Sequence, residues 1–210
     1  EHFEGFVPEV AWVTQGGEEK LDNKLALRPT SETIINHMYS LWIRSYQDLP
    51  LQINQWCNVV RWETKMTKPF IRGREFLWQE GHSAFASPKE AKENVDKVLN
   101  IYRRLIEERL KIATFFVKRP DWDKFAGAEE TISLETLMPD GKVLQAGTVH
   151  NLGRHFSKPM GIEFLDEKNQ KRNPHQTSWG VSTRLIGGVV MSHGDNKGLV
   201  LPAELAPVQI

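Results

Sequence analysis

The sequence predicts an α+β domain in which a mainly antiparallel sheet is flanked by helices. Segments typical of strands, separated by turns, make up most of the second half, at 113–117, 130–137, 143–150, 161–165 and 175–183. Helix patterns are few, and runs of strands that bracket a few helices are typical of α+β folds. With 210 residues, 40% of them hydrophobic and 26% charged, the chain can bury one sizeable core.

The first elements are predicted from turn and capping signals. Residues 6–14 have an extended pattern, and Gly16–Gly17 and Asp22–Asn23 indicate turns after it. Hydroxyl caps and an acid in the first turn, at 30–33, predict a helix that runs to about residue 46. Its buried stripe is expected to contain Ile34, Ile35, Met38, Leu41 and Trp42.

Two further helices are expected. Ser87-Pro88-Lys89-Glu90 combines a capping hydroxyl, a proline at the first helical position and an acid three residues after the cap. Apolar residues follow at helical spacing, so an amphipathic helix is predicted over 88–111. A glycine-bearing helix is predicted over 184–193.

The run from Asn54 to His82 predicts two strands joined by a basic hairpin. Side chains two apart on a strand share a face, so one face carries Phe76, Trp78, Glu80 and His82. On the preceding strand Val59, Arg61 and Glu63 share a face. Apolar residues of the opposite parity, Val60, Trp62 and Leu77, predict that both sides of the sheet are covered. Inward charges must then meet a ligand or one another, although a solvated salt-bridge ladder is the alternative.

Charge and cysteine content restrict the function further. Net charge is zero and the pI is about 7.3, so RNA contact must be local or be made by other parts of the protein. The dense basic patch is the hairpin at 65–74. The single cysteine, Cys57, excludes a disulfide within the chain and a cysteine-built zinc site, and it is interpreted as a small core residue. No apolar run is long enough to span a bilayer. We expect no membrane association and a cytoplasmic location.

Several sequence words resemble one enzyme family. Arg61-x-Glu63, a variable loop and Arg72-x-x-x-Phe76 resemble the second signature motif of class II aminoacyl-tRNA synthetases. GVSTRLIGG, with Arg184, resembles the third motif. The words LRPTSE, NQWCNVVRWE, REFLWQEGH and HGDNKGLVLP are similar to those of prolyl-tRNA synthetases of the eukaryotic and archaeal type. The resemblance covers nearly the whole chain.

The resemblance implies a reaction and a set of nucleotide contacts. The chain would activate L-proline with ATP, in the presence of Mg²⁺, to prolyl-adenylate and transfer proline to the 3′ end of proline tRNA. Arg61 is the expected catalytic residue, because a guanidinium fork can hold the carboxylate and the α-phosphate together. The ATP-binding set comprises Arg61, Glu63, Arg72, Phe76, Gln145, Thr148, Ser182 and Arg184. Gln145 would also contact Mg²⁺.

The resemblance also implies an amino-acid pocket. Glu32 and Thr30 would accept hydrogen bonds from the proline NH₂⁺ group, while Trp78 and Phe125 would pack the ring. The complete set comprises Thr30, Glu32, Arg61, Trp78, Glu80, His82, Phe125, His150, Gly180 and Ser182. From strand parity, Thr148 and His150 share a face, and Gln145 joins them only if Gly147 marks a bulge. His193 and Asp195 are interpreted as structural residues at a helix end and turn.

The domain reading is that residues 1–210 form the class II catalytic domain, without the first signature motif and without the C-terminal anticodon-binding domain. The full-length protein is expected to be a homodimer. One alternative is a truncated, catalytically weak ligand-binding or regulatory module derived from such a synthetase. Another is a class II synthetase for threonine or serine. Proline-dependent ATP–pyrophosphate exchange distinguishes these readings.

Overall fold

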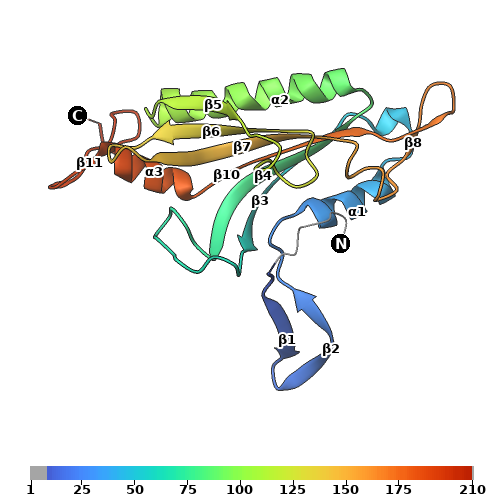
Figure 1. Cartoon of the computed structure of the whole chain (residues 1–210), viewed down its shortest axis with the longest axis horizontal. Helices are drawn as coiled ribbons and strands as arrows, with labels where there is room; N and C mark the ends of the chain where they lie inside the picture. Colours follow the sequence, from blue (N-terminus) through green and yellow to red (C-terminus); the bar gives the residue numbers. More distant parts are fainter. Residues whose placement is uncertain (1–8, 210) are drawn as a thin grey trace.

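The protein, seen in a computed structural model that describes residues 9–209, is built around one six-stranded antiparallel sheet (Figure 1). This confirms the predicted α+β fold class. Along the sheet the strands are β3 (Leu51–Val60), β4 (Glu75–Phe85), β10 (His175–Ser182), β7 (Val143–Gly153), β6 (Glu130–Leu137) and β5 (Thr114–Lys118). Two-residue strands form two small extra pairs, β8 (Phe164–Leu165) with β9 (Lys171–Arg172) and β11 (Gly194–Asp195) with β12 (Gly198–Leu199).

Helix α2 (Pro88–Arg103) covers one face of the sheet, and a π-helical segment (Arg104–Arg109) extends it. The predicted cap is confirmed, since Ser87 Oγ accepts from the Glu90 amide at 3.3 Å and the Glu90 carboxylate accepts from the Ser87 amide at 3.0 Å. The buried stripe of α2 packs on β6, β7 and β10 together with α3 (Arg184–His193). The main hydrophobic core therefore lies on the α2 side of the sheet. Much of the opposite face is not covered by this core.

Helix α1 (Glu32–Trp42) lies against that opposite face (Figure 1) and differs from its prediction. It ends at Trp42, and Ile34, Leu41 and Trp42 are about half exposed rather than buried. The buried positions are Glu32, Ile35, Asn36 and Tyr39. The hydrophobic pattern was misleading because two polar residues, Glu32 and Asn36, are buried and hydrogen-bonded, Glu32 to Thr30 before the helix and Asn36 to Gln176 on β10.

The N-terminal strands β1 (Trp12–Gly16) and β2 (Glu19–Ala26) form a hairpin that projects from the body (Figure 1). Gly17 has a φ of +62°, so the predicted turn at Gly16–Gly17 is confirmed. The turn predicted at Asp22–Asn23 is wrong, because both residues lie within β2. The start of the predicted extended segment, residues 6–8, lies outside the described residues.

Strand β3 is an edge of the sheet and ends at Val60, so Arg61 and Glu63 lie just beyond it rather than on the strand, where the sequence predicted them. The expected cover on both sides is also wrong here. Leu77 on β4 is 62% exposed because α2 packs over more central strands, and Trp62, in the turn after β3, is 50% exposed. Within residues 9–209, no helix is long and apolar enough to cross a membrane.

Candidate active site

The free face of the sheet carries the side chains that the sequence singled out. Directly paired residues on antiparallel strands point to the same side, so the register defines rows across the face. One row joins His82, Ser178, His150 and Thr131, the next joins Glu80, Gly180, Thr148 and Ser133, and the third joins Trp78 and Ser182. The alternation predicted for 76–82 is thus confirmed.

A cavity opens at the end of this face where β4 begins. Eight residues predicted for ATP or proline line it, namely Arg61, Phe76, Trp78, Gln145, Thr148, Gly180, Ser182 and Arg184. Gln145 joins them because the β6–β7 register shifts, so that Gly147 pairs with Leu134 whereas Gln145 pairs with Glu135. Ala146 is the extra residue of this bulge, as the predicted irregularity near Gly147 required.

Two arginines, Arg61 and Arg184, line this cavity, and the charge of a third, Arg72, acts on Arg184. Arg184 donates to the carbonyls of Ile71 at 2.8 Å and Gln145 at 3.2 Å. Burial, followed by the positive charges of Arg61 and Arg72, lowers the pKa of Arg184. Among the described residues, none of the three forms an ion pair with a carboxylate. Such a cluster favours an anionic ligand.

Arg61, which lies beyond the end of β3, is held by hydrogen bonds to two backbone carbonyls. Its amide donates to the Arg74 carbonyl at 2.7 Å, and its Nε donates to the Pro29 carbonyl at 3.2 Å. The guanidinium carbon lies 5.4 Å from the ring centroid of Phe76 and 5.8 Å from that of Trp78. By contrast, Glu63 is exposed in a turn and does not line the cavity.

Glu32, the first residue of α1, is a buried carboxylate with only 6% of its surface exposed. One oxygen accepts a hydrogen bond from the Thr30 hydroxyl. No lysine, arginine or histidine among residues 9–209 pairs with it. A buried carboxylate of this kind is costly unless a cation joins it.

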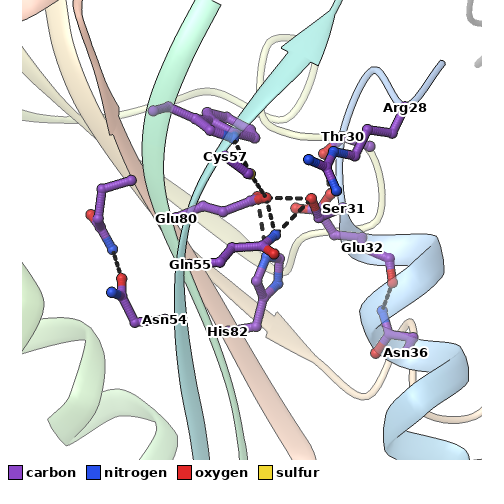
Figure 2. A network of polar contacts seen from close by, with 12 residues as sticks. Arg28, Thr30, Ser31, Glu32, Asn36, Asn54, Gln55, Cys57, Glu80 and His82 are labelled. Carbon is purple, nitrogen blue, oxygen red and sulfur yellow. Dashed lines mark hydrogen bonds and ion pairs between the residues drawn. The ribbon is translucent and has the colours of Figure 1, made fainter.

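Glu80 has the opposite environment, since both of its oxygens are engaged (Figure 2). Oε1 accepts from the Ser31 hydroxyl and the Gln55 amide and lies 3.4 Å from the Cys57 sulfur. Oε2 lies 3.2 Å from His82 Nε2. Burial raises the pKa of Glu80, but the hydrogen bonds from His82 and Ser31 and the charge of His82 outweigh it, so the pKa is lowered overall. Glu80 is therefore ionised and fully hydrogen-bonded.

Phe125 packs against His150, a member of the first row. Their ring centroids are 4.8 Å apart, and His150 Nδ1 lies 2.9 Å from the Thr131 hydroxyl. Burial, with a smaller contribution from His82, lowers the pKa of His150 to about 4. The imidazole is therefore neutral at physiological pH. The Phe125 amide also donates to Thr131 Oγ at 3.1 Å, which ties its loop to the sheet.

Several residues of this face were not identified from the sequence. Cys57 is not a small core residue, because its sulfur accepts from the Trp78 indole at 3.2 Å on the site side of β3. Gln55 and Cys57 are two residues apart on β3 and pair with Glu80 and Trp78, so strand parity could have placed both on the site face. Ser178 is 2% exposed between two histidines, and its hydroxyl has no partner among the described residues. His193, bonded to the Leu110 carbonyl at 2.7 Å, is structural as predicted.

The fold and this face define the core of a class II aminoacyl-tRNA synthetase. Residues 12–193 match the family model described as the tRNA synthetase class II core domain (G, H, P, S and T), and the chain belongs to this family. The predicted resemblance to the class is thereby confirmed.

Its relatives indicate a particular member of the class. The chain is 57% identical over its whole length to a proline–tRNA ligase of Symbiobacterium thermophilum and covers 43% of that protein. It is 53% identical to a chloroplastic/mitochondrial proline–tRNA ligase of Arabidopsis thaliana and covers 38% of that protein. A prolyl-tRNA synthetase of Cryptosporidium parvum in complex with halofuginone and AMPPNP superposes with a TM-score of 0.94 at 54% identity, over 98% of this chain and 42% of that one. The same enzyme has been solved with L-proline and AMP. The chain spans less than half the length of these relatives.

Proposed function

We propose that this chain is the catalytic core of a proline–tRNA ligase, which activates L-proline with ATP and transfers it to proline tRNA. One observation carries the proposal. A buried carboxylate without a cation, Glu32, and a cluster of arginines without an anion occupy one face of the sheet. An amino acid joined to ATP supplies both missing charges. The named relatives support proline as that amino acid.

The proposed first step joins two anions. The proline carboxylate oxygen attacks the α-phosphorus of ATP, a P–O bond forms, and pyrophosphate leaves with the electron pair of the broken bond. Arg61 engages the carboxylate and the α-phosphate together, which a planar fork does better than a lysine ammonium. Arg184 and Arg72 neutralise the remaining phosphates, and Phe76 offers a flat apolar surface to adenine.

The proposed ring pocket selects by shape. Glu32 and Thr30 accept from the NH₂⁺ group, while Trp78, Phe125 and His150 surround the three ring methylenes. Burying each methylene contributes roughly 0.8 kcal/mol. Larger side chains are excluded, but small ones such as alanine are discriminated less well. Threonine and serine would leave their hydroxyls against the apolar wall of Phe125.

Magnesium is proposed to arrive with ATP. Gln145 lines the cavity beside the arginines and is the residue proposed to contact it. Glu135, which pairs with Gln145 across the strands, already forms an ion pair with Arg119. The described residues hold no group of three or more acids, histidines or cysteines that could bind a metal on their own. A single side-chain oxygen, that of Gln145, fits Mg²⁺, because this ion commonly takes one or two protein oxygens together with substrate phosphates.

Exchange of labelled pyrophosphate into ATP, measured separately with each amino acid, tests the proposal. We expect exchange with proline and far less with serine and threonine. Binding of proline and ATP without exchange would instead support the catalytically weak module. Transfer to proline tRNA, a homodimer and a cytoplasmic location remain predictions, and the first is tested by charging of proline tRNA.

A further inference from the structure

Serine residues precede three helical segments, and two of the three cap their helix through the side-chain hydroxyl. Ser87 Oγ accepts from the Glu90 amide, and Ser45 Oγ accepts from the Gln47 amide. Ser31 precedes α1 but its side chain makes no capping hydrogen bond. It is 1% exposed, and its hydroxyl donates to Glu80 instead. The first turn of α1 therefore forgoes a stabilising contact that serine normally provides.

Ser31 belongs to a network that spans three elements (Figure 2). Gln55, on β3, donates both to Ser31 Oγ at 2.9 Å and to Glu80. Cys57, also on β3, accepts from the Trp78 indole at 3.2 Å and lies 3.4 Å from Glu80 Oε1. The start of α1 is thus connected to the indole through side chains of β3 and β4.

The two ends of this network adjoin the two parts of the proposed proline pocket. Ser31 stands between Thr30 and Glu32, which are proposed to hold the ammonium. Trp78 is proposed to pack the ring. Glu80 is 2% exposed and its oxygens are filled by protein donors, so it would have to release a donor to touch a substrate.

We propose that Ser31, Gln55 and Cys57 are positioning residues that act through Glu80 and Trp78 to set the distance between the ammonium site and the ring wall. This inference rests on the proposed function and deepens it. Glu80 is then the centre of the network rather than a direct ligand of proline. Amino-acid selectivity depends on residues that do not touch the amino acid.

A matched pair of serine variants separates positioning from folding. Ser31→Ala removes a hydrogen bond to the buried Glu80 carboxylate, so we expect the thermal midpoint to fall and the Kd for proline, measured by calorimetry, to rise about tenfold. The Kd for ATP should stay within about twofold, because the arginine cluster is intact. Ser87→Ala removes a real cap and should lower the thermal midpoint with both Kd values unchanged.

A second pair tests the connection to Trp78. Cys57→Ala removes the acceptor of the indole N–H, so proline should bind more weakly and alanine should compete better. Cys57→Ser keeps an acceptor for the indole and a donor for Glu80, and it should restore most of the selectivity. A purely structural role would not produce this rescue.

The outcomes distinguish this inference from the proposed function. Calorimetric binding does not require catalysis, so a parent protein that binds proline but shows no exchange contradicts the function while still testing the network. The network proposal is overturned if Ser31→Ala leaves proline binding unchanged, or weakens proline and ATP equally. It is also overturned if Cys57→Ser and Cys57→Ala behave alike.

Discussion

The change Glu32→Gln tests whether the Glu32 carboxylate pairs with the proline ammonium. It preserves size and removes the buried negative charge that has no cation in the protein. A proline ammonium placed against an amide would be desolvated and unpaired, a loss on the order of 3 kcal/mol, which corresponds to about 100-fold in Kd. Calorimetric titration of proline and ATP measures it, and ATP should bind as before.

The same change predicts an unusual result for stability. Because no protein cation loses its partner and the Thr30 hydroxyl can still donate to the amide oxygen, the thermal midpoint of the ligand-free protein should not fall. Glu130→Gln is the control, since it neutralises an acid paired with Lys118 away from the site, and it should leave both Kd values within about twofold. Normal proline binding by Glu32→Gln would refute the reasoning.

Three further predictions follow from named contacts. Arg61→Lys keeps the charge but loses the fork, so pyrophosphate exchange should fall by about 100-fold or more with unchanged circular dichroism; exchange within a few-fold of the parent would exclude the role. Trp78→Ala should weaken proline and admit larger amino acids, measured by exchange across amino acids. Because the pKa of His150 is about 4 when folded and about 6.5 when unfolded, the free energy of unfolding should fall as pH drops from about 6.5 to 4. Urea denaturation of His150→Gln should show a smaller fall over that window.

Much of the fold follows from local signals in the sequence. Helix α2 was predictable because Ser87, Pro88 and Glu90 agree with the apolar spacing that follows. The functional face of β4 was predictable because strand parity alone places Phe76, Trp78, Glu80 and His82 together. Such features depend on neighbours along the chain, which the sequence displays directly.

The errors concern long-range contacts. The buried side of α1 carries Glu32 and Asn36, so hydrophobic spacing indicated the wrong stripe. Ser31 resembles a helix cap, but its hydroxyl donates to Glu80 on β4. This contact depends on how the start of α1 lies against the sheet. The part that Cys57 plays depends on the register that pairs it with Trp78. Propensity and parity cannot supply a register between strands separated by a long loop.

A crystal structure of the protein with proline and a non-hydrolysable ATP analogue would show the proposed pocket occupied. We expect the proline nitrogen within hydrogen-bonding distance of Glu32 and Thr30, the ring between Trp78 and Phe125, and the carboxylate and α-phosphate joined by Arg61. Glu80 should keep its bonds to Ser31 and Gln55. A proline nitrogen bound to Glu80, or an adenosine phosphate chain distant from Arg61 and Arg184, would contradict the proposed pocket.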